Sequence, residues 1–102
     1  MVTVTKKDLV QKISQKKNLH PSEVLQVVQI FLDEMTASLA KGDRLEFRDF
    51  GVFEITRRKQ KIGRNPKNAA IPIVIPARLV VKFTPGKKMK TMIEQLPIDL
   101  AF

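Results

Sequence analysis

A long segment without any acidic residue divides this chain of 102 residues. Between Glu54 and Glu94 the sequence holds eleven of its nineteen lysines and arginines and none of its ten carboxylates, so nearly all of the net charge of +9 lies in one half. Mutual repulsion of these charges opposes compact folding unless an anion screens them. A short basic run is usually only a solvated surface. A run of this length indicates a surface that binds a polyanion, most often nucleic acid.

The first half of the chain has the apolar spacing of two helices. Thr5 and Asp8 have the spacing of a capping box at the start of the first helix. His20 is able to cap the second helix, and Pro21 suits its first turn. Gly42 suits the left-handed position that ends it. We expect the two helices over about residues 5–17 and 21–41.

The apolar stripe of the second helix is wider than a small sheet needs on one side. Two interpretations stay open: a well-buried core helix, or a dimer interface. A chain of 102 residues is enough for one domain, with a core that a monomer fills only marginally. A partner chain would therefore stabilise this fold.

From Arg44 onward the period changes to the alternation that is typical of a half-buried strand. Gly51, within DFGVF, permits a bend or a close approach of two backbones that a side chain would block. After Ile55 the sequence TRRKQK has no apolar face, so we expect a β-ribbon that projects into solvent. Its return limb carries Pro72 and Pro76, whose missing N–H groups would face one outer edge and block it against aggregation.

A third helix is expected over about residues 85–96, with Thr84 as a possible cap and Pro85 in the first turn. Residues 97–102 would form a short apolar tail after a single domain of residues 1–96. No apolar run approaches the roughly 20 residues of a membrane-spanning helix. No secretory signal opens the chain, so we expect a cytosolic protein without a membrane partner.

Two lysine pairs, Lys6 with Lys7 and Lys87 with Lys88, lie at the starts of the first and third helices. This placement opposes the helix dipole, which favours negative charge at an N-terminus. A phosphate would reverse the effect, because free N–H groups of the first turn and the ammonium groups would converge on it. The alternative is a pair of surface lysines without a role.

The chain lacks the side chains that enzymatic catalysis needs, since it has one histidine, no cysteine and no tyrosine. His20 fits a helix cap better than a metal ligand, because metal sites need three or four donors. The sequence PGKK lacks the spacing of a phosphate-binding loop. We therefore expect no catalysis, no metal, no cofactor and no small-molecule substrate.

The motifs DFGVF, GRNP and PGKK, in this order, resemble those of the bacterial HU and integration host factor (IHF) family of DNA-bending proteins. The resemblance covers about residues 3–96. It implies an α+β fold: an N-terminal helix pair, a three-stranded antiparallel sheet with a long β-ribbon arm, and a short C-terminal helix, intertwined in a dimer. Two arms would wrap double-stranded DNA through the minor groove and bend it, organising the bacterial chromosome in the nucleoid. Whether the dimer is a homodimer or a heterodimer with a sister chain stays open.

The resemblance also implies roles for residues at matching positions. Pro66 would insert between base pairs at the arm tip, and Gly51 would be the bend that launches the arm. The other arm residues at the DNA would be Arg57, Arg58, Lys59, Lys61, Arg64, Asn65, Lys67, Arg78 and Lys82. The body residues that hold phosphates would be Lys6, Lys87 and Lys90. The aromatic residues of the dimer core would be Phe31, Phe47, Phe50 and Phe83.

The chain departs from the family pattern at the arm tip. NAA follows NPK where the family has a Thr-Gly turn, so any left-handed residue there would be Asn65 or Asn68. The stretch from GRNP to PGKK is one residue longer than the common pattern, which predicts a bulge in the return limb.

Two other classes of protein fit the basic charge. One is an RNA-binding or ribosome-associated module, although the segment from Thr56 to Ala77 lacks the aromatic residues on which such modules stack bases. The other is a protein that binds a membrane surface or an acidic partner. This last class predicts no dependence on Pro66.

Overall fold

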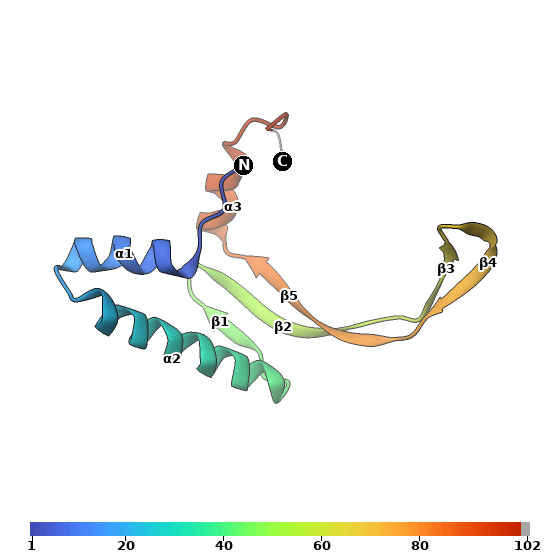
Figure 1. The fold of residues 1–102 in the computed structure, drawn as a ribbon, viewed down its shortest axis with the longest axis horizontal. Coiled ribbons are helices and arrows are strands. Elements are labelled where there is room, and N and C mark those ends of the chain that lie inside the picture. The colour runs from blue at the N-terminus through green and yellow to red at the C-terminus, as the bar shows by residue number, and fades with distance from the viewer. Residues whose placement is uncertain (101–102) are drawn as a thin grey trace.

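The computed structural model describes residues 1–100 and confirms the expected α+β fold (Figure 1). Two helices are followed by five strands and a third helix. The elements are α1 (Lys6–Lys17), α2 (Pro21–Ala40), β1 (Leu45–Phe47), β2 (Gly51–Arg58), β3 (Lys61–Asn65), β4 (Asn68–Ile75), β5 (Arg78–Pro85) and α3 (Lys87–Glu94). The last two residues of the predicted 97–102 tail lie outside the described residues.

Local capping residues define the helix pair α1 and α2. Thr5 Oγ1 accepts a hydrogen bond from the Asp8 N–H at 3.3 Å, and Asp8 Oδ2 accepts one from the Thr5 N–H at 2.9 Å, which confirms the capping box. The predicted cap on α2 is also confirmed, because His20 Nδ1 accepts from the Ser22 N–H at 3.2 Å. Gly42 has the predicted positive φ, 87°.

The body of the molecule contains a three-stranded antiparallel sheet in the order β1-β2-β5. β5 pairs with β2 as far as Pro85, which lies opposite Gly51. The predicted start of the third helix at Thr84 and Pro85 is therefore wrong, because both residues belong to the β5 ladder. Gly86 is the N-cap of α3 instead, and its N–H donates to Phe50 O at 2.8 Å.

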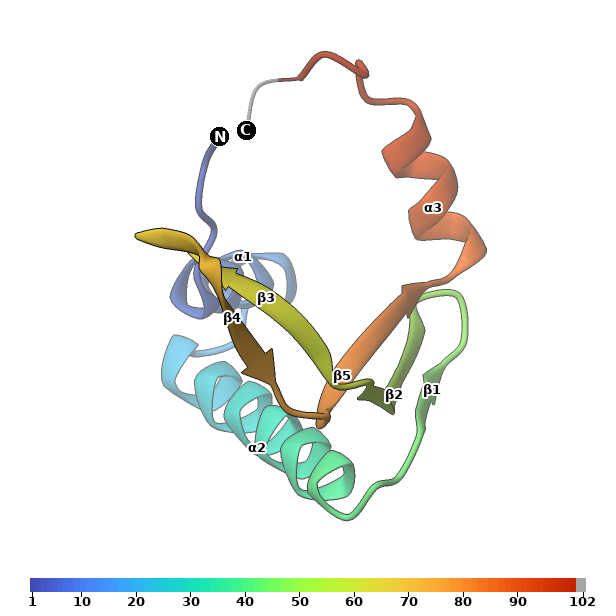
Figure 2. The same ribbon diagram turned by 90° about the vertical axis from the view of Figure 1, so that its right-hand side faces the viewer.

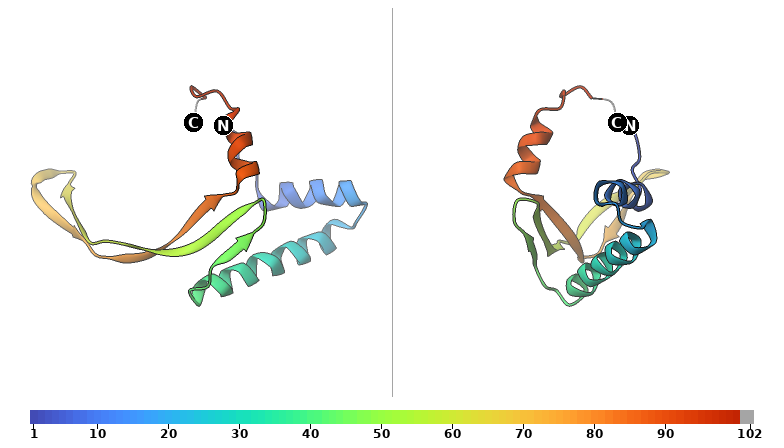
Figure 3. Two further views of the ribbon diagram at one scale, coloured as in Figure 1. Left: turned by 180° about the vertical axis from the view of Figure 1, so that it is seen from behind. Right: turned by 90° about the vertical axis from the view of Figure 1, so that its left-hand side faces the viewer.

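The arm ends in a second, separate sheet made of β3 and β4. Residues 59–60 on the outgoing limb and 76–77 on the return limb lie in neither sheet. Pro72 lies within β4, whereas Pro76 falls in the break, so the prediction that one strand carries both prolines on one edge is wrong. In Figures 1 and 3 the arm extends from the body on the side away from the helix pair.

The arm tip turns without a left-handed residue. The register passes from Arg64 opposite Pro72 to Asn65 opposite Asn68, so the extra residues lie on the return limb, where a bulge was predicted. Neither Asn65 nor Asn68 has a positive φ, so neither supplies the left-handed residue for which these two were the candidates. Their side chains close the turn instead. Asn65 Oδ1 accepts from the Lys67 N–H at 2.9 Å, and Asn68 Oδ1 accepts from the Ala70 N–H at 3.1 Å.

The protomer is open rather than compact. Its radius of gyration is 19.1 Å, whereas a compact domain of this length has a radius near about 13 Å. Its accessible surface is 9232 Å², against roughly 5,800 Å² for a compact monomer of this mass. Figure 2, a view along the arm, shows the helix pair and α3 on opposite sides of the molecule.

The wide apolar stripe of α2 is not covered by the protomer itself. Val24 is buried, whereas Val27, Ile30 and Phe31 are more than half exposed. Within residues 1–100, Val10 and Val24 are the only buried large apolar side chains. The interpretation of α2 as a well-buried core helix is therefore wrong for the single chain, and this stripe requires a cover.

Candidate nucleic-acid interface

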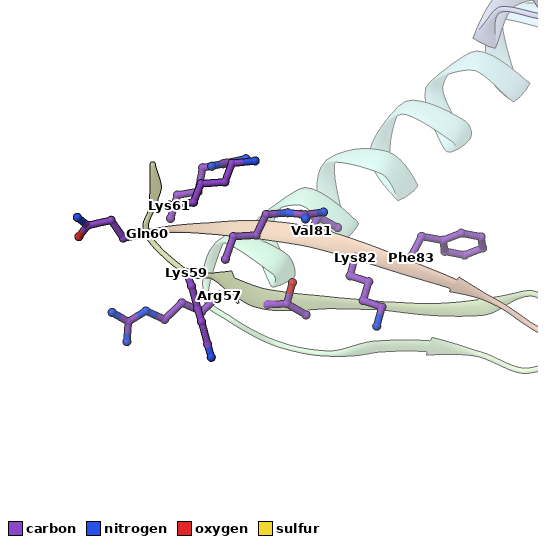
Figure 4. A pocket seen from close by; sticks show the side chains of 10 residues that line it. Arg57, Lys59, Gln60, Lys61, Val81, Lys82 and Phe83 are labelled. Atoms are coloured by element: carbon purple, nitrogen blue, oxygen red, sulfur yellow. The ribbon is translucent and has the colours of Figure 1, made fainter. Parts of the chain in front are cut away.

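An open groove of about 780 Å³ lies where the arm leaves the body (Figure 4). β2 and β5 pair along this region, so side chains from both limbs of the arm meet there. Among residues 1–100, none with a carboxylate side chain lines the groove. Its basic residues are Arg57, Arg58, Lys59, Lys61, Arg78 and Lys82. Six of the predicted arm residues are thus brought together in one positively charged groove.

Strand pairing separates these basic residues onto two faces. Arg58 lies directly opposite Arg78 in the β2–β5 ladder. The next pair on the same face, two residues farther along, is Thr56 opposite Val80. Directly opposite residues share a face, so the two guanidinium groups repel each other in the absence of an anion. Arg57, one residue away, lies on the other face, opposite Leu79. The Arg58 and Arg78 pair therefore favours an anionic partner on its own face.

The acidic residue nearest to the basic segment is already paired. Arg44 Nε lies 4.0 Å from Glu54 Oε2, and Arg44 Nη1 lies 4.0 Å from Glu46 Oε2. Glu54 also lies opposite Lys82 in the β2–β5 ladder. The carboxylates of the body therefore balance cations at the start of the sheet, and the charge farther along the arm stays unbalanced.

Pro66 and Lys67 form the turn at the end of the arm, between β3 and β4. Both residues are exposed, and so is Arg64 on the approaching strand. The Asn65 side chain is occupied by its hydrogen bond to the Lys67 N–H. The tip therefore presents a rigid apolar ring between two cations, while Asn65 holds the turn.

The two helix starts that carry lysine pairs differ from each other. At α1 the Asp8 N–H is capped by Thr5 and the Asp8 carboxylate occupies the first turn, so the expected free donors are not all available there. Hydrogen bonds from the Thr5 backbone and side chain lower the pKa of Asp8, and Lys12 and Lys7 add to the effect. The Lys6 ammonium donates to Gln29 Oε1 of α2.

At α3 the expected arrangement is present. No side chain caps this helix, and its first turn has no acidic residue. Lys87, Lys88 and Lys90 are carried by its first four residues. Free N–H donors and ammonium groups thus occur together at this helix start, which suits a phosphate.

Five phenylalanines form a cluster between α2 and the sheet. Phe31 of α2 has its ring centroid 5.7 Å from that of Phe47, and Phe53 lies 4.6 Å from Phe83. Phe50 joins the cluster at 5.6 Å from Phe83. Phe31 and Phe50 are 53% and 47% exposed, so the cluster is open on one side. The four predicted core aromatics are thus brought together, and an open aromatic surface is a feature of protein interfaces.

Sequence reasoning missed several residues of this region. Phe53 is in the aromatic cluster, and its alternation with Ile55 was the signal for a core-facing position. Thr56, Gln60 and Val81 line the basic groove, but nothing in their sequence context distinguished them. Asp49 has a positive φ of 67° in the turn before Gly51, a conformation in which aspartate is enriched.

A sequence profile of the family described as Bacterial DNA-binding protein matches residues 4–94. The chain belongs to this family. The match covers α1 to α3, including the whole arm. The match confirms the resemblance to the HU and IHF family that the three motifs indicated. This family consists of DNA-binding proteins rather than enzymes.

Relatives of the chain are named as HU and integration host factor proteins. A protein of Chlamydia pneumoniae named probable DNA-binding protein HU is 64% identical over 94 residues, which are 92% of this chain and 94% of the relative. Integration host factor subunit alpha of Aliivibrio fischeri (strain MJ11) is 34% identical over 98 residues, 96% of this chain and 99% of the relative.

Solved HU structures share the fold. The protein in an Anabaena HU-DNA cocrystal structure superposes with a TM-score of 0.82 at 28% identity, over 91% of this chain and 100% of that chain. A mutant of HU from Thermotoga maritima gives a TM-score of 0.65 at 28% identity, over 88% of this chain and 99% of that chain. In the described part of this HU-family chain, no helix is long and apolar enough to cross a membrane.

Proposed function

We propose that this HU-family protein is an architectural DNA-binding protein of the bacterial nucleoid. A dimer wraps duplex DNA with its two arms through the minor groove, and Pro66 of each arm inserts between base pairs and bends the helix. The observation that carries the proposal is the arm itself. It extends away from the body, its base is lined by six basic residues and no acid, and it ends in the exposed Pro66.

A second copy of the chain is the partner that we propose for the open aromatic cluster. The protomer exposes Phe31, Phe50 and the apolar stripe of α2 on the surface that a partner would cover. Burying this surface releases about 25 cal/mol per Å² of apolar area. Dimerisation also sets two arms on one body, and two arms can produce two kinks in one DNA molecule.

The wedge at the arm tip accounts for bending in physical terms. Inserting an apolar ring between base pairs unstacks one step at a cost of a few kcal/mol, and the bent DNA then contacts more of the protein. Pro66 has a fixed ring and lies between Arg64 and Lys67, whose charges can bind the adjacent phosphates. The minor groove distinguishes little beyond A·T from G·C, so DNA deformability decides where the protein binds.

The body extends the same interface toward α3. We propose that Lys87 and Lys90 hold phosphates there, together with the free N–H groups at the start of α3. Lys6 would add a third contact from α1, where Gln29 holds its side chain in position. Contacts of this kind set affinity and not sequence preference.

A bending assay with Pro66→Ala tests this function. Short duplexes labelled at both ends report the end-to-end distance by energy transfer, and the wild type should shorten it. We expect Pro66→Ala to bind through the remaining charges but to bend the duplex much less. Pro97→Ala, in the segment after α3, is the matched control and should bend DNA as the wild type does.

Two outcomes count against the proposal. A wild-type protein that binds DNA without shortening the distance would refute bending itself. A Pro66→Ala variant that bends as strongly as Pro97→Ala would refute the wedge.

A further inference from the structure

One limb of the arm has no polar side chain over nine successive residues, 69–77. β4 contains most of this run, and all of its residues before Ile75 are exposed. Val74 is 59% exposed, and Ile62, which lies opposite on β3, is 69% exposed. An exposed apolar strand of this length favours self-association unless a partner covers it.

Apolar side chains lie on both faces of this part of the arm. Ile62 pairs with Val74 on one face, and Gly63 pairs with Ile73 on the other. A Cβ added to Gly63 would meet the Ile75 side chain at 3.4 Å, so this second face is also lined by isoleucine. Either face of the β3–β4 part of the arm therefore presents apolar side chains to a binding partner.

The charge around β4 identifies the kind of partner. Lys61 and Arg64 lie on the neighbouring strand, Lys67 is in the turn, and the segment has no carboxylate. A fitting partner presents phosphates on either side of an apolar surface. The minor groove of B-form DNA does so, because its walls are deoxyribose C–H groups and phosphates border it. The minor groove of an RNA duplex is wide and shallow and displays 2′-hydroxyl groups instead.

We propose that β4 makes the arm selective for DNA against RNA. None of the side chains from Ala69 to Ala77 can donate or accept a hydrogen bond. A 2′-hydroxyl covered by this limb would lose its water and gain no new partner from these side chains, which costs free energy. A deoxyribose has no hydroxyl at that position and is covered without the penalty. The inference rests on the proposed function, since it assumes that the arm lies in the groove of a duplex.

The test compares three duplexes of one sequence at one salt concentration by fluorescence anisotropy: DNA, RNA, and RNA with fluorine in place of each 2′-hydroxyl. The fluorinated duplex keeps the A-form shape but has no hydroxyl donor. We expect the wild type to bind DNA about tenfold or more tightly than RNA, the effect of one unpaired hydroxyl. The fluorinated duplex should bind roughly threefold or more tightly than the RNA duplex.

The double variant Ile73→Thr/Val74→Thr places a hydroxyl on each face of the arm. Threonine is a good strand former, so the arm keeps its pairing. We expect the ratio of DNA to RNA affinity to fall by roughly threefold or more. Val2→Thr is the matched control, because Val2 is 86% exposed and lies before α1, outside the strands of the arm. It should leave the ratio unchanged.

The results separate failure of this inference from failure of the proposed function. A protein that bends DNA in the Pro66 assay but binds RNA equally well overturns only the selectivity, and so does a double variant whose ratio matches that of Val2→Thr. A fluorinated duplex that binds as weakly as RNA assigns selectivity to groove shape and also overturns the role of β4. Wild type that binds RNA tightly and fails to bend DNA instead supports an RNA-binding module, against both proposals.

Discussion

Of the four glycines in the chain, Gly51 is the one at which substitution by alanine should destabilise the fold the most. A Cβ at Gly51 would lie 2.6 Å from the Thr84 carbonyl oxygen and 2.6 Å from Phe83 Cε1. The carbonyl is part of the β2–β5 ladder, and the ring packs against Phe50 and Phe53, so neither can move freely. Overpacking of this kind costs about 2–3 kcal/mol. Gly51→Ala should therefore lower Tm by roughly 10 °C or more.

Gly63→Ala is the matched control for this prediction. A Cβ at Gly63 would lie 3.4 Å from Ile75 Cδ1, which is an ordinary contact, so we expect a change in stability within about 0.5 kcal/mol. Thermal unfolding followed by circular dichroism, at one protomer concentration because dimer stability depends on it, measures both variants. If Gly51→Ala melts together with Gly63→Ala, the close approach of β5 does not explain the glycine.

Thr5→Ala should lower the free energy of unfolding by about 1 kcal/mol in a urea titration, whereas Thr5→Ser should retain most of it. Hydrogen bonds from Thr5 hold the pKa of Asp8 below its ordinary 3.8, so the carboxylate stabilises the fold above that pH and loses this effect as the pH falls through the lowered pKa. Asp8→Asn should accordingly be less stable than wild type at neutral pH but not in strong acid, and equal stability at both would contradict the capping role. Lys87→Ala should weaken DNA binding across sequences and reduce the salt slope by about one unit. Lys41→Ala, whose ammonium lies 3.8 Å from Asp43, should change the slope less.

Features that depend on a few neighbouring residues were predicted correctly. Thr5 with Asp8 and His20 with Pro21 placed the starts of two helices, because a cap satisfies N–H groups within two or three residues of itself. The basic segment and the arm were also predictable, since a ribbon with charge on both faces cannot lie on a core. The motifs around Gly51 and Pro66 indicated the family.

Features that depend on distant strands were not predictable in the same way. Thr84 and Pro85 have the local signature of a helix start, yet β5 continues because β2 offers them partners across the sheet. Asn65 or Asn68 was the candidate for any left-handed residue at the tip, but the register there needs none, and both side chains accept hydrogen bonds from the turn backbone instead. Pro76 lies in the break between the two sheets, whereas Pro72 lies within β4. The sequence contexts of the two prolines are alike, so the sequence did not distinguish their positions.

The sequence by itself determined the starts of the first two helices, the basic arm and its terminal proline, because caps, charge and proline act over a few residues. Tertiary structure alone decided which basic residues share a face, as Arg58 does with Arg78. It also decided that Phe31 and Phe50 stay open toward a partner. The physical reason is that strand register and exposure depend on residues far apart in the chain, and no local pattern encodes where two such segments meet.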